Sequence, residues 1–157
     1  MNKNVVAGLA LAGASAVGGL IYASESLMSF LSVWEGEKQF VVYADNLAGG
    51  LPTVCRGLTR HVTDTPIVVD EVWPESKCLA EETKALLKIQ GRLINCYVIE
   101  PPQSVFDSGS SHSWNFGVLS TCGSDAMQAW RKGDWVTGCE RLAKAADGRR
   151  VWSFVRT

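Results

Sequence analysis

The stretch WEGEKQFVVYADNLAGGLPTVCRGLT, residues Trp34–Thr59, joins the end of one helix to a short pair of strands. Before it, Leu27, Phe30 and Leu31 recur at helical spacing, and Gly36 is a typical helix stop. Within it, β-branched and aromatic residues flank Asn-Leu-Ala-Gly-Gly, which is the composition of a turn between two strands. The stretch therefore predicts a helix end that leads into a small antiparallel sheet.

The remainder of the chain is predicted to be mainly helical, which indicates an α+β fold class. A long helix is expected from about Glu75 to Tyr97, where leucines and isoleucines form an apolar face. Pro101-Pro102 suits the first turn of a second helix, and residues 123–134 and 134–148 predict two short helices that close near glycines. Residues 60–76 form a connector that can hold one short strand.

The N-terminus carries an uncharged apolar segment, which predicts a helix ahead of the main domain. Residues 4–24 hold no charge between Lys3 and Glu25, and these 21 residues are enough to span a bilayer as a helix. Six of them are Ala and four are Gly, so the free energy gained on transfer into lipid is small. A cationic start and small-x-small triplets also fit a cleavable signal peptide. We expect residues 1–25 to export the chain, as a signal or as a weak anchor; a buried helix is less favoured because Gly/Ala runs pack poorly.

Charge and cysteine content exclude some classes of function. The chain has 157 residues and a net charge of -1, so it lacks the basic surface that nucleic-acid binding requires. With two His and no C-x-x-C pair, we expect neither a metal site nor a cofactor. Five cysteines in an exported chain favour disulfides. The sequence leaves their connectivity open; we favour Cys78–Cys96 and Cys122–Cys139, with Cys55 as the odd residue.

Two carboxylates stand out in the opening stretch. Glu35 lies at the predicted helix end, and Asp45, in the hairpin, is the only carboxylate between Glu37 and Asp64. Two carboxyl groups across a cleft are what cleavage of a glycosidic bond needs, one as proton donor and one to activate water or attack the sugar. The Thr53 hydroxyl is placed to orient the water. Such residues also occur in ordinary surface segments, so the spacing alone leaves both interpretations open.

The same stretch resembles the catalytic region of the phage-type lysozymes, the bacteriophage endolysins whose motif runs E-G, Y-x-D, T-x-x-G-x-T. Here the three parts are Glu35-Gly36, Tyr43-Ala44-Asp45 and Thr53-Val54-Cys55-Arg56-Gly57-Leu58-Thr59. Residues 104–124 are similar to the second hallmark of the family, with Trp114-Asn115-Phe116-Gly117 at its turn, and residues 130–142 match the helix that follows. The resemblance extends from about Ser26 to Leu142.

This resemblance implies a fold, an activity and roles for individual residues. The fold is a small antiparallel sheet lobe plus a helical lobe over residues 26–157, and the activity is hydrolysis of the β-1,4 bond between N-acetylmuramic acid and N-acetylglucosamine of peptidoglycan. Glu35 is then the general acid, Asp45 the second carboxylate, and Thr53 the residue that places the water. We expect a monomer that acts on peptidoglycan during host-cell lysis and binds no nucleic acid.

The N-terminal segment looks like the signal-anchor-release segment of one endolysin branch. In that branch the enzyme is held inactive at the inner membrane and then escapes to the periplasm. Cysteines near the catalytic Glu can hold an inactive form there, which makes Cys55 a candidate regulatory thiol through thiol–disulfide exchange.

Two departures from the family pattern leave alternatives open. The interval from Glu35 to Asp45 is one residue longer than is common in the family, and that from Asp45 to Thr53 two residues longer. An extra residue in a strand reverses the facing of its side chains unless a bulge absorbs it. The chain also ends at Thr157 without the usual Arg-rich C-terminal helix. The alternatives are a catalytically inactive relative that binds glycan, and a holin-like small membrane protein.

Overall fold

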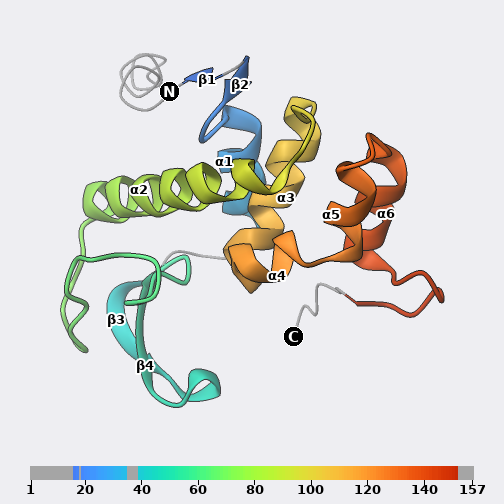
Figure 1. Cartoon of the computed structure of the whole chain (residues 1–157). Coiled ribbons are helices and arrows are strands. Elements are labelled where there is room, and N and C mark those ends of the chain that lie inside the picture. The colour runs from blue at the N-terminus through green and yellow to red at the C-terminus, as the bar shows by residue number, and fades with distance from the viewer. Residues whose placement is uncertain (1–15, 18, 35–38, 152–157) are drawn as a thin grey trace. The chain divides into compact units, whose positions relative to one another are not determined.

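The computed structural model describes residues 16–17, 19–34 and 39–151, which form two compact units (Figure 1). The first, here called the hairpin unit, is residues 28–88; the second, the helical unit, combines residues 1–27 with residues 89–157. Helix α1 (Glu25–Trp34) and helix α2 (Glu75–Leu93) each continue from one unit into the other. Both helices were expected from apolar periodicity, and the structure confirms them.

The hairpin unit contains the predicted antiparallel pair, β3 (Gln39–Asp45) and β4 (Leu51–Cys55). Its turn holds a short 3-10 helix, η1 (Asn46–Ala48), followed by Gly49 and Gly50 at φ of 67° and 82°. Those positive φ values are readily adopted only by glycine. The turn thus accommodates the two additional residues between Asp45 and Thr53.

The register of the hairpin shifts within β3. Gln39 pairs with Cys55 and Tyr43 with Thr53, so four steps along β3 oppose two along β4. On its other side, β3 pairs with the connector: the Val42 N–H donates to the Glu71 carbonyl at 2.9 Å, and Val41 bridges Val72. The connector therefore does hold a short extended segment. The irregularity lies inside the interval that is longer than usual, as a β-bulge that absorbs extra residues would.

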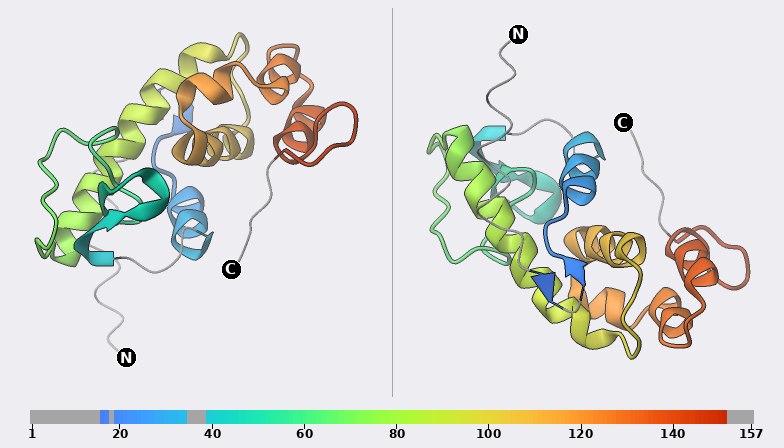
Figure 2. Two further views of the ribbon diagram at one scale, coloured as in Figure 1. Left: turned by 90° about the horizontal axis from the view of Figure 1, so that it is seen from below. Right: turned by 90° about the horizontal axis from the view of Figure 1, so that it is seen from above.

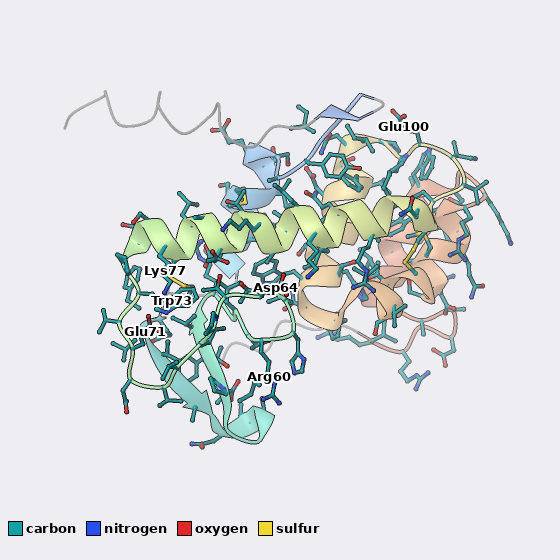
Figure 3. The ribbon with its side chains drawn as sticks, turned by 60° about the vertical axis from the view of Figure 1, so that its left-hand side comes forward. Arg60, Asp64, Glu71, Trp73, Lys77 and Glu100 are labelled. Atoms are coloured by element: carbon teal, nitrogen blue, oxygen red, sulfur yellow. A yellow bond between two sulfur atoms is a disulfide. The ribbon has the colours of Figure 1, made fainter. Side chains whose placement is uncertain are left out.

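A compact core supports the hairpin unit. Its fully buried side chains include Val42, Val54, Leu58, Trp73 and Leu86. The Lys77 ammonium lies 3.8 Å from the centre of the Trp73 ring and donates to Glu71 at 3.2 Å. Figure 3 labels these three side chains. A cation over an indole face contributes a modest stabilisation. These contacts attach the connector to the start of α2.

The helical unit consists of short helices around aromatic side chains. After η2 (Ile94–Cys96), the chain forms α3 (Gln103–Phe116), α4 (Val118–Cys122), α5 (Asp125–Trp130) and α6 (Trp135–Ala143). Figures 1 and 2 show α5 and α6, in orange and red, side by side. Tyr97 stacks on Trp130 at 5.8 Å and meets the edge of Phe106 at 6.4 Å.

The boundaries of these helices follow local signals. Ser124 accepts a hydrogen bond from the Met127 N–H, and Asp134 accepts one from the Thr137 N–H, so each caps the helix that follows it. The helix expected after Pro101-Pro102 is confirmed, and the helices expected over 123–134 and 134–148 are confirmed with shorter bounds. Helix α4 was not expected, because Gly117 reads as a helix end, whereas here its φ of 84° turns the chain directly into another helix.

The predicted N-terminal helix lies mostly outside the described residues. Where the structure describes the segment, β1 (Ala16–Val17) pairs with β2 (Leu20–Ile21), so a helix is wrong for those residues. The Gln103 side-chain amide accepts from the Ile21 N–H at 2.8 Å and donates to its carbonyl at 2.9 Å, which are bonds that an extended segment can make. Among the described residues, no helix has the length and apolar character needed to cross a membrane.

The predicted disulfide pairing is wrong. The structure joins Cys55 to Cys78 and Cys96 to Cys122, with Cys139 free. Cys78 lies in the first turn of α2 and Cys96 just beyond its end; a helical rise over 18 residues separates them by about 27 Å, too far for a disulfide. Cys96 instead meets Cys122 beside Arg131, whose guanidinium donates to both of their carbonyls, at 2.8 and 3.2 Å.

Candidate active site on the β-hairpin

Asp45 lies at the end of β3, directly opposite Leu51. Its side-chain Oδ1 accepts the Leu47 N–H at 2.9 Å, and its backbone carbonyl accepts the Gly50 N–H at 2.7 Å. The side chain is half-buried. One carboxylate oxygen is thus anchored by the turn, while Oδ2 makes no hydrogen bond within the described part of the chain.

Thr53 lies on β4 and pairs with Tyr43 across the hairpin. Its side chain is buried, and its hydroxyl donates to the Leu51 carbonyl at 3.0 Å. Because that bond takes the only hydroxyl proton, the remaining capacity of Oγ1 is to accept. A water molecule at this position would donate to Thr53 and turn its own lone pair elsewhere.

The hairpin brings Asp45 and Thr53 onto one face. Residues directly opposite each other in an antiparallel pair share a face, and so do residues two apart on one strand. The pairs Asp45–Leu51 and Tyr43–Thr53 therefore project to the same side. Asp45 and Thr53 are diagonal neighbours, which places them about 7–8 Å apart.

Tyr43 lies on the same face, although the sequence motif gave it no role of its own. Burial, and secondly the negative charge of Asp45, raise the pKa of the Tyr43 phenol above its ordinary value of 10.0. The phenol is therefore neutral at neutral pH and close enough to feel the carboxylate. It adds a hydrogen-bonding group to the face that carries Asp45 and Thr53.

Glu35, the predicted general acid, lies outside the described residues, so its role remains a prediction. Helix α1 ends at Trp34, directly before it, and the predicted helix end is correct to that point. Phe30, on the same helix, is partly exposed.

The turn that follows β4 explains the rest of the T-x-x-G-x-T motif. Val54 and Leu58 exchange two backbone hydrogen bonds, at 3.1 and 2.9 Å, which closes a tight loop with Gly57 at a φ of 81°. The Thr59 hydroxyl accepts the His61 N–H at 3.3 Å, and so caps the next turn. Cys55 lies in this loop and is bonded to Cys78, so it is not the unpaired cysteine expected from the sequence, and its regulatory role through thiol–disulfide exchange stays a prediction.

The turn is also held by an ion pair that was not anticipated from the sequence. Glu82, on α2, accepts the Arg56 N–H at 3.0 Å and the Arg56 Nη1 at 3.2 Å, and only 3% of Glu82 is exposed. Acidic residues of a helix normally face water. No periodicity distinguishes Glu82 from the exposed charges of the same helix.

A separate concave site lies in the helical unit. A cavity of about 240 Å³ is lined by residues of α3 to α6 and the segment after α6: His112, Phe116, Ser120, Ser124, Asp125, Arg141, Leu142, Ala145 and Val151. The His112 ring lies 2.9 Å from the Thr121 hydroxyl and against Phe116, and burial lowers its pKa. His112 therefore has a structural role here, while His61 is exposed. Within the described ranges, no group of three or more His, Cys, Asp or Glu side chains could hold a metal ion.

Comparison with known proteins identifies the fold. Residues 32–156 match a protein-family model described as phage lysozyme. An endolysin from Escherichia coli O157:H7 phage FAHEc1 aligns with a TM-score of 0.65 and 19% identity, over 83% of this chain and 82% of the other. A mutant of P22 lysozyme aligns with a TM-score of 0.66 and 18% identity, over 82% and 88% of the two chains.

A third solved structure, the muramidase domain of SpmX from Asticaccaulis excentricus, has a TM-score of 0.63 and 19% identity over 76% of each chain. No curated protein matches the sequence. The described sheet and helices confirm the predicted α+β, phage-lysozyme-like fold. With four-fifths of its residues matched by the family model, the chain belongs to the phage lysozyme family.

Proposed function

We propose that this protein is an endolysin that hydrolyses the β-1,4 bond between N-acetylmuramic acid and N-acetylglucosamine in peptidoglycan. The observation that carries the proposal is the shared face of Asp45 and Thr53 on the hairpin, within the residues that match the family. A carboxylate and a hydroxyl at this separation can hold one water between them. The names of the similar structures, an endolysin, a lysozyme and a muramidase domain, agree with this substrate class.

The proposed reaction needs three roles. Glu35 donates its proton to the glycosidic oxygen as the bond to the sugar carbon breaks. A water molecule then adds to that carbon. Thr53 holds this water by accepting a hydrogen bond from it, and Asp45 takes up the proton that the water loses as it reacts. Because the Thr53 hydroxyl already donates to Leu51, it presents an acceptor to the water. The leaving sugar thus carries the proton of Glu35 and the other sugar carries the hydroxyl of the water, while the proton left on Asp45 returns through solvent to Glu35 before the next turnover.

Glu35→Gln tests the assignment. The variant keeps a side chain of the same size but cannot donate a proton, so release of glycan fragments should fall by at least about 100-fold with an unchanged melting temperature. Purified sacculi are digested and the fragments analysed by mass. Glu37→Gln is the matched control, since it makes the same change two residues away and outside the motif.

The products also decide between reaction classes. Muramidase action leaves reducing-end N-acetylmuramic acid, whereas a lytic transglycosylase leaves an anhydro product and an amidase releases free peptides. Sacculus binding without any fragment release would identify an inactive glycan-binding relative instead. Undiminished hydrolysis by Glu35→Gln would refute the assignment of the acid.

We further propose that residues 1–25 first hold the enzyme at the inner membrane of the host and that the released form acts in the periplasm. Weak hydrophobicity of the uncharged run 4–24 supports escape, and two disulfides suit an oxidising compartment. In the described fold the Ala23 N–H donates to Gln90 at 2.8 Å, so an inserted segment must end before this residue or give up that bond.

Fractionation of expressing cells at successive times tests this order. The protein should first sediment with inner membranes and later occur in the periplasm with an intact N-terminus by mass. A periplasmic form shortened by the length of the segment would indicate a cleaved signal, and cytosolic protein throughout would contradict export.

A further inference from the structure

The loop after β4 has a backbone conformation that needs external support. Cys55 has a φ of 58°, in the left-handed region that side chains other than glycine rarely adopt. Only Arg56 and Gly57 lie between Cys55 and Leu58, whose backbone bonds to Val54 close the loop. Such strained positions persist where the surroundings determine the conformation.

Two links to α2 supply that support. The Cys55–Cys78 disulfide is covalent, and the paired bonds of Arg56 to Glu82 are ionic. Cys78 and Glu82 are four residues apart, so they occupy the same face of the helix one turn apart. Two consecutive residues of the loop, Cys55 and Arg56, are thus bonded to residues one turn apart on α2.

The buried ion pair between Arg56 and Glu82 contributes more to positioning the loop than to the stability of the fold. Glu82 is 3% exposed, and the buried Arg56 Nε makes no hydrogen bond within the described part of the chain. Desolvation of two charges generally cancels much of their attraction, and an apolar pair would pack there at least as well. What an apolar pair could not do is fix the Arg56 backbone N–H, which Glu82 holds at 3.0 Å.

We propose that Glu82 is a positioning residue for the reaction proposed above, on which this inference rests. By holding the Arg56 N–H, it fixes the end of β4 three residues from Thr53. The two residues between Thr53 and Arg56 are themselves held in place, because Val54 is hydrogen-bonded to Leu58 and Cys55 forms a disulfide with Cys78. Glu82 therefore sets the place at which Thr53 presents its acceptor to the water, without touching the substrate itself.

The neighbouring acid provides a matched control. Glu81 is also buried, but its carboxylate accepts from the Thr63 hydroxyl at 2.8 Å and from Lys84 at 3.0 Å, and makes no bond to the loop. Glu81→Met and Glu82→Met are the same chemical change at adjacent positions of one helix, and Met has a similar length but no hydrogen-bond acceptor for a backbone N–H. Only the second alters the link to Arg56.

The experiment compares both variants with the unmodified chain by steady-state kinetics on soluble glycan strands and by amide hydrogen exchange. Glu82→Met leaves the Arg56 N–H without its acceptor and should lower kcat at least about tenfold with KM within about twofold, because a displaced water slows chemistry more than binding. Exchange at the Val54 and Leu58 amides should accelerate by a similar factor. Glu81→Met should change neither quantity, and both disulfides should stay formed by mass.

The outcomes are separable. Equal losses of kcat in both Met variants, or an unchanged kcat in Glu82→Met, would overturn the positioning role. Absence of glycan hydrolysis by the unmodified chain would overturn the proposed function, while the exchange rates would still decide whether Glu82 holds the loop. Arg56→Lys provides a second test, since it keeps the charge and the backbone bond and should retain most of kcat even if Glu82→Met folds poorly.

Discussion

Gly138 is a position in the helical unit where the packing leaves no room for a side chain. It lies in the interior of α6, and a Cβ atom there would overlap the Cδ1, Nε1 and Cγ atoms of the Trp130 indole. Trp130 cannot withdraw easily, because it is fully buried, stacks on Tyr97 and donates through Nε1 to the Trp135 carbonyl at 3.3 Å. Gly138→Ala should therefore destabilise the protein.

The magnitude follows from opposing contributions. Replacing Gly by Ala in a helix interior favours folding by about 1 kcal/mol. Overpacking a core costs about 1–3 kcal/mol, and loss of the Trp130 hydrogen bond adds about 1 kcal/mol. The balance is a net destabilisation of about 1–3 kcal/mol, which corresponds to a fall in melting temperature of several degrees for a chain of this length.

Gly91→Ala is the matched control. Gly91 lies in α2, where an added Cβ meets no atom within 4 Å, so only the helix propensity acts. This variant should gain about 0.5–1 kcal/mol. Urea unfolding followed by circular dichroism measures both variants. A Gly138→Ala protein as stable as Gly91→Ala would refute the described packing of α6 on Trp130.

Two further predictions concern the helical unit. Burial lowers the pKa of His112 below 6.5, so the unfolded chain binds the imidazole proton more readily than the folded one. The contribution of neutral His112 to the free energy of unfolding should therefore be fully present above pH 6.5 and be lost as the pH falls through the folded-state pKa. Urea midpoints over a pH series should show a shallower decline for His112→Asn, and equal slopes would contradict this. Replacing Cys96 and Cys122 together by Ser removes a cross-link of sequence separation 26 and should cost about 3.5 kcal/mol in the same assay. An unchanged midpoint would count against that disulfide.

Local patterns in the sequence were sufficient to predict the helices and strands whose signals come from residues close together in the chain. The alternation and turn residues of 39–55 predict the hairpin, and the apolar repeat after Glu75 predicts α2, because both signals depend on neighbours close in the chain. The E-G, Y-x-D and T-x-x-G-x-T motifs likewise place Asp45 and Thr53 on adjacent strands. Predicted elements therefore deviate mainly in their bounds.

Features that depend on distant parts of the chain were not predictable in this way. Leu20 to Ala23 read as part of an apolar helix. Instead Gln103, far along the chain, bonds to the extended Ile21, and Gln90 accepts the Ala23 N–H in the turn that follows. The cysteine partners were missed for the same reason. Which thiols meet is decided by how α2 and the later helices fold back, and sequence spacing records only chain separation.

The sequence alone determined the family motif, the α+β order of elements and the candidate residues Glu35, Asp45 and Thr53. The tertiary structure decided that Asp45 and Thr53 share a face, because that depends on how the long turn sets the pairing of Tyr43 with Thr53 and of Asp45 with Leu51. It also decided that Cys55 is fastened beside Arg56 and Glu82. A covalent or ionic partner is chosen by proximity in space, and that proximity exists only once the chain has folded.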